Sequence, residues 1–299
     1  MNGNLGRDRL WNQQIWSDID NAVRDEVGRV RVAQKVFPCT LVPNWQQVPK
    51  DQLSTEASDI LKIQEGRTKP FVEIWVEFSL TQSQVDSEES LHTGRTLARL
   101  AANKIAAKED SLLFHGNALS AAALTKAAVA AKQPTPTYLV KIENADSLDK
   151  GLLGEDPGTK GAHLHVGTKG TTVKPEELVG KVVEGIGKLS TSAHAGPYAL
   201  FLSSQKFAEA STPLTGTTVT PADRISPLLT GGFYGTGCLP DADALLASLG
   251  GELTTIYIGI DATTAFTKTE PNGTYRFRVF ERIQFVARDP SVFLRLVLK

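Results

Sequence analysis

Cysteine, excess charge and long hydrophobic runs are all scarce in this 299-residue sequence. Cys39 and Cys238 are the only cysteines. They are too few for a disulfide framework and lack the paired spacing of a zinc site, so we expect two reduced structural thiols. The 32 Lys and Arg residues balance 33 Asp and Glu residues, for a formal net charge of −1. Because basic residues are not in excess, the charge does not predict nucleic acid or an anionic membrane as a partner.

The longest apolar runs lie at 198–202 and 292–298, and both are far shorter than the roughly 20 residues that a helix needs to cross a bilayer. This excludes an integral membrane protein, and we expect no membrane partner. The segment 1–8 has neither the apolar stretch nor the cleavage site of a secretory signal peptide. We therefore expect a cytoplasmic protein.

Familiar catalytic motifs are missing as well. Lys181 and Lys188 each follow a glycine, but Val182 and Leu189 stand where a P-loop needs the hydroxyl that holds magnesium. The sequence contains no Gly-x-Ser-x-Gly nucleophile elbow and no His-Glu-x-x-His zinc motif. We therefore predict no catalytic residues, no metal site and no resident cofactor, which argues against an enzyme.

The histidines leave alternatives open. His163 and His165 would lie on the same side of a strand, which is half of a metal site. No further ligand has companion spacing, however, and the other interpretation is a surface turn. His115 stands near Glu109 and Asp110 like an acid–base cluster, yet a histidine at the end of a helix also interacts favourably with the helix dipole.

Hydrophobic periodicity predicts a mixture of helices and strands. Ile15, Ile19, Val23 and Val27 recur every fourth residue and predict an amphipathic first helix. Apolar and polar residues alternate at 71–80 and predict a strand. Similar reasoning predicts further helices at 93–114, 118–132 and 175–189, and further strands at 198–202, 254–260 and 275–287.

Two irregular segments separate these elements. The stretch 43–70 is polar and has few periodic apolar positions, and a loop of that length usually serves a function or an interface. Glycine recurs between 151 and 170, which predicts a turn-rich connection that could mark a domain boundary.

Several short motifs carry a family resemblance through their order and spacing over residues 10–299. They are Trp16-x-x-Ile19-Asp20, Pro70-Phe71-Val72-Glu73-Ile74, Phe78-Ser79-Leu80 with Asp86, Glu109-Asp110-x-x-Leu113-Phe114-His115-Gly116, Gly151-Leu152-Leu153, Gly196-Pro197-Tyr198-Ala199-Leu200, Gly231-Gly232, Gly250-Gly251, Gly259-x-Asp261, Phe280-Glu281 with Phe285, and Asp289-Pro290. No single motif is specific. Together they resemble the encapsulins, the bacterial and archaeal nanocompartment shell proteins once described as linocin-type bacteriocins.

The resemblance implies an α+β fold, the phage major capsid fold of the Hong Kong 97 type. That fold has a peripheral domain, an axial domain and an extended loop that reaches a neighbouring subunit. The implied organisation is an amino-terminal helix and arm at 1–42, the extended loop at 43–70, the peripheral domain at 71–150 with its spine helix and an insertion at 118–150, the axial domain at 151–265, and a return to the peripheral domain at 266–299.

The implied function is that of a bacterial shell protein. It would assemble with itself into an icosahedral nanocompartment, enclose a cargo protein recruited by a short targeting peptide, and exchange small solutes through pores. The alternative is a viral or prophage major capsid protein, which would package nucleic acid. A third interpretation, an uncharacterised enzyme, needs a nucleophile and a base, and the sequence shows no such pair.

The resemblance also suggests sites. The targeting peptide would dock near Val23, Val27 and Val30, although these side chains could instead pack on the spine helix. The candidate pore lining is the loop Ser190, Thr191, Ser192, Ala193, His194, Ala195 and Gly196. An imidazole there would change charge near neutral pH and tune ion passage. Some family members bind a flavin through a Trp after the first strand, where this chain has Ser83, so we expect no flavin.

Overall fold

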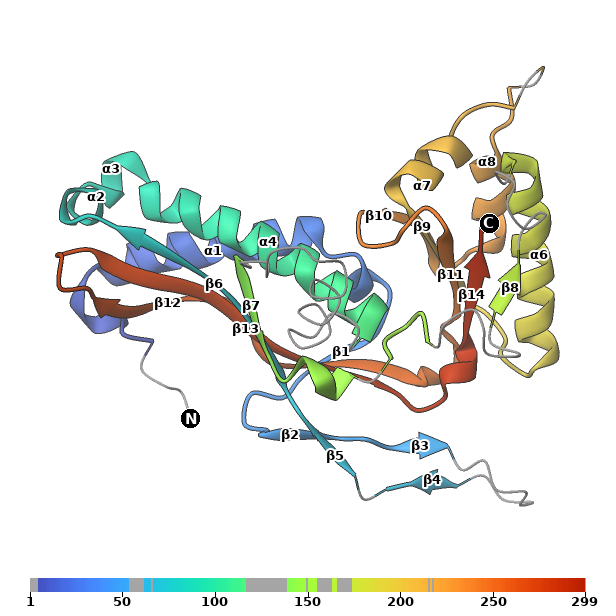
Figure 1. Ribbon diagram of the computed structural model, residues 1–299, viewed down its shortest axis with the longest axis horizontal. Coiled ribbons are helices and arrows are strands. Elements are labelled where there is room, and N and C mark those ends of the chain that lie inside the picture. The colour runs from blue at the N-terminus through green and yellow to red at the C-terminus, as the bar shows by residue number, and fades with distance from the viewer. Residues whose placement is uncertain are drawn as a thin grey trace, which may run out of the picture.

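The chain folds into two five-stranded sheets and a narrow two-stranded arm (Figure 1). The computed structural model describes residues 5–53, 62–65, 67–116, 139–148, 150–154, 163–165, 174–214, 216 and 218–298. Among these residues, no helix is long and apolar enough to cross a membrane.

The first sheet has the strand order β1-β12-β13-β6-β7. Its members are β1 (Cys39–Leu41), β12 (Thr254–Thr269), β13 (Tyr275–Ala287), β6 (Val72–Leu80) and β7 (Val140–Glu143). All neighbours are antiparallel except β1, which runs parallel to β12. The long β12–β13 hairpin turns at the Pro-Asn-Gly that the sequence marks as a turn.

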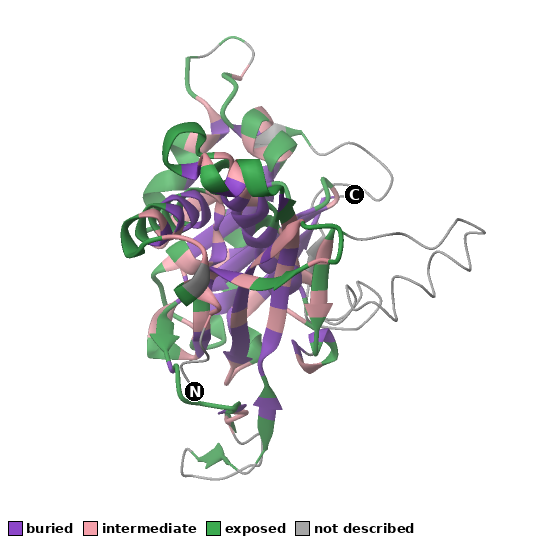
Figure 2. Ribbon diagram, turned by 90° about the vertical axis from the view of Figure 1, so that its left-hand side faces the viewer, coloured by how far each residue is buried: buried purple, intermediate pink, exposed green. Residues whose placement is uncertain are grey.

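Two long helices, α1 (Gln13–Val30) and α4 (Thr93–His115), lie against each other and against this sheet (Figure 1). The short helices α2 (Gln82–Asp86) and α3 (Glu88–Leu91) lead from β6 into α4. Figure 2 shows that buried residues gather where the helices meet the sheets. This layer is the main hydrophobic core.

Aromatic side chains fill the core beneath the first turns of α1. The ring of Phe277 on β13 is fully buried and stacks on Trp11 and on Phe78, with centroid distances of 5.1 and 5.3 Å. Trp16 and Phe266 meet the same ring at steeper angles. Aromatic pairs of this kind stabilise the fold by more than the apolar area that they bury. Phe277 therefore couples α1 to the centre of the sheet.

The carboxyl end of α4 is closed by a distant segment. Leu152 N and Leu153 N donate to the carbonyl oxygens of Leu113 and Phe114 at 2.8 and 3.0 Å. Gly151 has a φ of 67° and packs so closely on this helix end that a Cβ would lie 2.4 Å from a backbone nitrogen. The Gly-Leu-Leu motif therefore satisfies helix carbonyls that would otherwise lack partners.

The second sheet has the order β10-β9-β11-β14-β8. Its strands are β10 (Gly232–Thr236), β9 (Tyr198–Ser203), β11 (Asp243–Ser248), β14 (Phe293–Val297) and β8 (His163–His165). Helix α6 (Pro175–Thr191) packs on β11 and β14, and the shorter α7 (Ser204–Ala210) and α8 (Pro221–Ile225) complete this unit. Short 3-10 turns connect the elements at η1 (Arg7–Arg9), η2 (Ala33–Lys35), η4 (Ala145–Leu148), η5 (Ser226–Leu228), η6 (Gly250–Glu252) and η7 (Pro290–Val292).

Residues 43–70 form the arm. Strand β2 (Gln47–Pro49) pairs with β5 (Thr68–Pro70), and β3 (Gln52–Leu53) pairs with β4 (Ile63–Gln64). The arm extends away from the first sheet, and most of its described residues are exposed (Figures 1 and 2). Backbone pairing gives this polar segment its order, which hydrophobic periodicity could not indicate.

The chain crosses between the sheets at different points from those expected. Residues 254–265 were assigned to the axial domain but belong to β12 of the first sheet. Residues 266–299 were expected to return to the peripheral domain, yet β14 pairs with β11 of the second sheet. Strand pairing decides which sheet a strand joins, and the sequence pattern does not show it. An apolar run such as 292–298 fits the centre of either sheet equally well.

Most expected elements are confirmed. Helices at 93–114 and 175–189 and strands at 71–80, 198–202 and 275–287 match the structure to within a few residues, and the strand expected at 254–260 continues to 269. The helix expected at 118–132 lies outside the described residues. Within the insertion 118–150, the described part supplies β7, an edge strand of the first sheet.

We predict that Phe277→Ala lowers the free energy of unfolding by about 3–5 kcal/mol, because it removes a ring packed between several others. Leu91→Ala is the matched control: Leu91 is 68% exposed, and its loss should change stability by no more than about 0.5 kcal/mol. Denaturant unfolding of both variants tests this. Equal effects would contradict the packing described for Phe277.

Candidate functional site

The described residues contain no group of three or more His, Cys, Asp or Glu that could hold a metal ion. His115 lies at the end of α4, where its Nε2 is 2.7 Å from the carbonyl oxygen of Cys238, and not beside a reactive group. His163 and His165 lie on β8, which pairs with β14. Cys238 is half-buried, whereas Cys39 is exposed, contrary to the usual burial of a free thiol.

The candidate pore lining, residues 190–196, begins in the last two residues of α6 and continues as the loop that leads to β9. Helix α6 ends in a Schellman motif: His194 N donates to Leu189 O at 2.9 Å, Ala193 N donates to Ser190 O at 3.1 Å, and Ala193 has a φ of 64°. Six of the seven loop residues are exposed, and His194 is half-buried. The loop is therefore an ordered turn at the molecular surface.

The imidazole of His194 is turned back onto the protein. Its Nε2 lies 2.7 Å from Ser291 Oγ and 3.7 Å from Asp289 Oδ2, and the side chain is 12% exposed. Ser291 Oγ donates its proton to Asp289, so His194 Nε2–H is the donor to Ser291. Tyr198 OH donates to the carbonyl oxygen of His194 at 3.0 Å. In this conformation the loop exposes its small residues more than its imidazole.

A double-mutant cycle tests this contact. We predict that His194→Ala and Ser291→Ala are coupled by about 0.5–1.5 kcal/mol in the free energy of unfolding, because they remove the two ends of one hydrogen bond. Strictly additive effects in denaturant unfolding would show that the imidazole does not bind Ser291.

The valines proposed for the peptide groove do not form one. Val23 and Val27 are 0% and 2% exposed, and Val30 is half-buried. They belong to the apolar stripe of α1, which packs on α4 and the first sheet. The stripe that the sequence revealed is therefore part of the core, and this corrects the candidate site.

A groove does lie beside the first turns of the same helix. It has a volume of about 600 Å3 and is lined by Arg7, Trp11, Trp16, Asp20 and Arg24, among others. Arg7 donates to both carboxylate oxygens of Asp20 at 2.6 and 2.8 Å, and its guanidinium lies 5.0 Å from the centroid of the Trp16 ring. The groove therefore places the half-buried Trp11 beside charged side chains, while Trp16 is almost fully buried.

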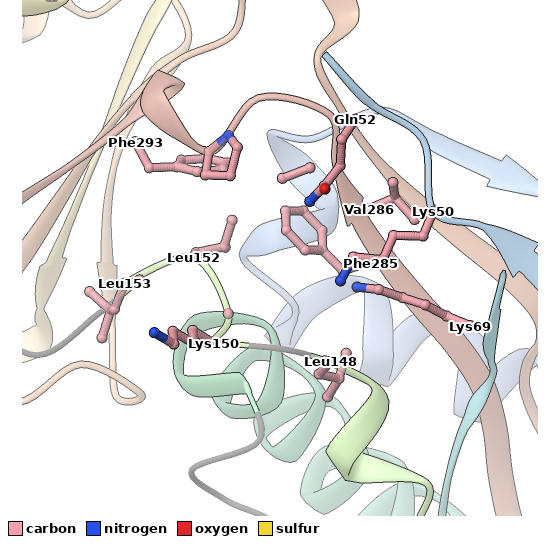
Figure 3. A pocket seen from close by; sticks show the side chains of 14 residues that line it. Lys50, Gln52, Lys69, Leu148, Lys150, Leu152, Leu153, Phe285, Val286 and Phe293 are labelled. Atoms are coloured by element: carbon pink, nitrogen blue, oxygen red, sulfur yellow. The ribbon is translucent and has the colours of Figure 1, made fainter. Parts of the chain in front are cut away.

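A second cavity, of about 400 Å3, lies where the base of the arm meets both sheets (Figure 3). Leu152, Phe285 and Phe293 give it apolar walls. Lys50 and Lys69 enter it from the arm (Figure 3). Ser83 lies elsewhere, on α2, where it is exposed.

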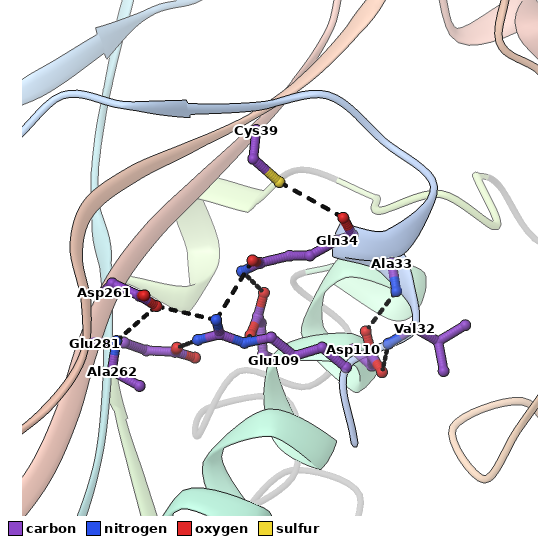
Figure 4. A network of polar contacts seen from close by, with 10 residues as sticks. Val32, Ala33, Gln34, Cys39, Glu109, Asp110, Asp261, Ala262 and Glu281 are labelled. Carbon is purple, nitrogen blue, oxygen red and sulfur yellow. Dashed lines mark hydrogen bonds and ion pairs between the residues drawn. The ribbon is translucent and has the colours of Figure 1, made fainter. Parts of the chain in front are cut away.

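The most highly charged part of the interior surrounds Arg31, just after α1 (Figure 4). The Arg31 side chain is 6% exposed and forms ion pairs with Glu109 and Glu281, both 0% exposed. Arg31 Nη1 also donates to Asp261 Oδ1 at 3.0 Å. Gln34 Nε2 donates to the other oxygen of Glu109 at 2.6 Å. We call these five residues the Arg31 cluster.

Asp110 extends the Arg31 cluster along α4. Its two carboxylate oxygens accept from Val32 N at 2.8 Å and from Ala33 N at 2.9 Å. Burial, reinforced by the negative charge of Glu109, raises the pKa of Asp110 to about 7. Burial and Glu109 also raise the pKa of Glu281 well above its usual value, against the opposing effect of Arg31.

The sequence motifs contain the acidic residues at this site but not the residues that bind them. Glu109, Asp110, Asp261 and Glu281 all stand in motifs that carry the family resemblance, whereas Arg31 and Gln34 stand in none. Glu109 and Glu281 stand on the faces of the predicted helix and strand that the hydrophobic pattern assigns to the interior. That placement is the feature of the sequence that could have indicated a buried charge cluster. A buried carboxylate requires a partner, and that partner is Arg31.

We predict that Arg31→Met lowers the free energy of unfolding by about 3–5 kcal/mol, because Glu109 and Glu281 would remain buried without a counter-charge. Arg29→Met is the matched control on the preceding turn. Arg29 is 70% exposed and pairs with Glu26, so its loss should cost no more than about 1 kcal/mol. Thermal or denaturant unfolding separates the two, and similar losses would refute the role assigned to Arg31.

The comparisons with known proteins agree with the architecture. The chain matches a protein family described as "Encapsulating protein for peroxidase" over residues 5–145 and 154–284. No curated protein sequence matches the chain.

Solved structures with the same fold include shells of several kinds. The virus-like particle from Pyrococcus furiosus is 16% identical with a TM-score of 0.64, and the match covers 94% of this chain and 98% of that one. The capsid protein of Myoviridae phage XM1 is 10% identical with a TM-score of 0.58, covering 89% and 90%. The SrpI encapsulin from Synechococcus elongatus is 12% identical with a TM-score of 0.55, covering 88% and 85%.

These similarities confirm the fold that the motifs implied, the α+β capsid fold of the Hong Kong 97 type shared by phage capsids and encapsulin shells. The family is one of encapsulating shell proteins rather than of enzymes. By the extent of its match, the chain belongs to the Linocin_M18 family, the encapsulating proteins for peroxidase.

Proposed function

We propose that this chain is the self-assembling subunit of an encapsulin nanocompartment, a closed icosahedral shell in the bacterial cytoplasm that encloses a cargo enzyme and exchanges small solutes through pores. The family match along nearly the whole chain carries the proposal. Catalysis would then belong to the cargo.

The surface of the subunit suits repeated contacts with copies of itself. Most described residues of the arm are exposed, and Leu41, Trp45 and Ile63 at or near it are 63%, 42% and 52% exposed. Leu100 on α4 and Val183 on α6 are 58% and 51% exposed. Exposed apolar side chains at several separate places favour association through different faces, and such contacts give a closed particle when the rotation closes.

For cargo recruitment, we propose that a short targeting peptide docks in the groove beside the first turns of α1. The half-buried ring of Trp11 and the charged groups of Arg7, Asp20 and Arg24 suit a peptide with both apolar and charged residues. Arg24→Glu, with Arg29→Glu as a control on the same helix, should reduce the cargo that co-purifies with shells from the native host. Equal cargo content in both variants would remove this groove from the proposal.

For solute exchange, we propose that the loop 190–196 lines a pore at a symmetry axis. Its exposed residues are small, and four of the seven carry a hydroxyl or an imidazole. If His194 turns outward in the shell, ion entry should change between pH 5.5 and 7.5, and His194→Ala should abolish that change. An unchanged pH response in the variant would remove His194 from the pore.

The second candidate function is that of a viral or prophage major capsid protein. The specific observation in its favour is the similarity to the phage XM1 capsid, whose TM-score of 0.58 exceeds that of the SrpI encapsulin. The near-neutral net charge of −1 favours the nanocompartment, because packaging nucleic acid calls for basic charge.

Particle content separates the two functions. We predict that particles from the chain expressed alone are hollow in negative-stain images and, after nuclease treatment, have the ratio of absorbance at 260 to 280 nm of pure protein. Particles that protect nucleic acid from nuclease would favour the capsid. The absence of any particle from folded protein would contradict both functions.

A further inference from the structure

The Arg31 cluster holds the segment that leads into the arm. Residues 31–42, which we call the lead-in segment, run from the end of α1 to the start of the arm. Arg31 joins this segment to α4, β12 and β13 through Glu109, Asp261 and Glu281. The backbone of the next two residues donates to Asp110, as described above. The first third of the lead-in segment is therefore attached through ionisable groups.

Packing and backbone pairing hold the rest of the lead-in segment. Phe37 packs in the core against Phe201, Phe285 and Phe293. Strand β1 pairs with β12 at the edge of the first sheet, and Val42 N donates to Ile258 O at 2.8 Å. The arm therefore has one attachment through β5 into β6 and a second through the lead-in segment, whose first residues are held by the Arg31 cluster.

The charges around this attachment do not balance. The ionisable groups that face one another are Arg31 after α1, Cys39 on β1, Glu109 and Asp110 on α4, Cys238 between β10 and β11, Asp261 on β12 and Glu281 on β13. Arg31 is basic, and so is Lys108 on α4, which faces Cys238. With every carboxyl group ionised, one guanidinium would face four carboxylates, three of them on buried residues. Such an excess is costly away from water unless some carboxyl groups keep a proton.

One oxygen of Glu281 lies away from every protein donor. Glu281 Oε1 is fully buried and has no hydrogen-bond partner, while the other oxygen of Glu281 binds Arg31. Protonation of Glu281 would remove a buried negative charge that this oxygen cannot share with a donor, and the burial of such a charge is unfavourable. The register of β12 shifts between Ile258 and Thr263, and this irregular stretch contains Asp261, which meets Arg31 from the solvent side. Water can therefore reach the cluster along one edge.

We propose that the Arg31 cluster is a proton-operated latch: the protonated cluster holds the first residues of the lead-in segment in place, and loss of the proton releases them. This inference rests on the proposed shell function, because the arm that follows the lead-in segment extends away from the first sheet (Figure 1). Release would loosen the arm and its contacts with neighbouring subunits, while β1 stays paired with β12.

Burial raises the pKa values of Asp110 and Glu281, and it outweighs the hydrogen bonds from Val32 N, Ala33 N and Arg31, which favour the ionised carboxylates. The direction of the pH effect follows from this balance. The latched state binds these protons more tightly than the released state, in which water reaches both groups. Latching is therefore strongest on the acid side and weakens as the pH rises from about 4, the ordinary value of such carboxyl groups, to about 7 for Asp110.

Hydrogen–deuterium exchange of the full-length protein tests the latch. The readout is the protection factor of peptides within 31–42, corrected for the pH dependence of free-peptide exchange. We expect protection in the wild type to fall at least tenfold between pH 5.5 and 8.5. Glu281→Gln has the same shape but no titratable group, and at pH 8.5 it should keep at least threefold more protection than the wild type.

Glu77→Gln is the matched control. Glu77 lies on β6 of the same sheet and pairs with Lys141, away from the lead-in segment, so this variant should behave as the wild type does. The latch would be overturned if the wild type showed equal protection of 31–42 at both pH values. It would also be overturned if Glu281→Gln lost as much protection as the wild type between pH 5.5 and 8.5.

The same samples separate failure of the latch from failure of the shell. Large particles whose lead-in protection does not depend on pH would end the latch alone. A chain that forms no particles would end the proposed function, while exchange at 31–42 would still test the latch in the free subunit.

Discussion

Arg31 is the residue on which the connection between the helices, the first sheet and the arm depends. A guanidinium in an almost fully buried position requires carboxylates as partners, and those of Arg31 lie on α4, β12 and β13. These three elements and the segment after α1 are therefore held together by one side chain. The Arg31 ion pairs fix how these elements are oriented more than they add to the free energy of unfolding, because desolvation offsets much of the attraction in a buried ion pair.

Short turns connect the strands of one sheet to the strands of the other. The β12–β13 hairpin spans the first sheet, and its ends continue through η6 and η7 into β11 and β14 of the second. Phe37, Phe201, Phe285 and Phe293 pack at this crossing. The two sheets are therefore joined both along the chain and by aromatic packing.

Local patterns in the sequence were sufficient for most helices and strands, because the burial of one face imposes a period of about 3.6 or 2 residues. They could not assign β14 to its sheet, since pairing is set by distant partners. They also could not distinguish a docking groove from a core stripe at Val23 and Val27, because both are apolar. The Arg31 cluster was equally hidden, since Asp261 and Glu281 lie 230 and 250 residues away from Arg31.

The central claim is that this subunit exists to form a closed shell. The molar mass of the freshly purified protein, measured by light scattering after size-exclusion chromatography near pH 6, tests it most directly. We predict one uniform species in the megadalton range. A folded monomer or small oligomer of the 32.3 kDa chain under these conditions would contradict the claim.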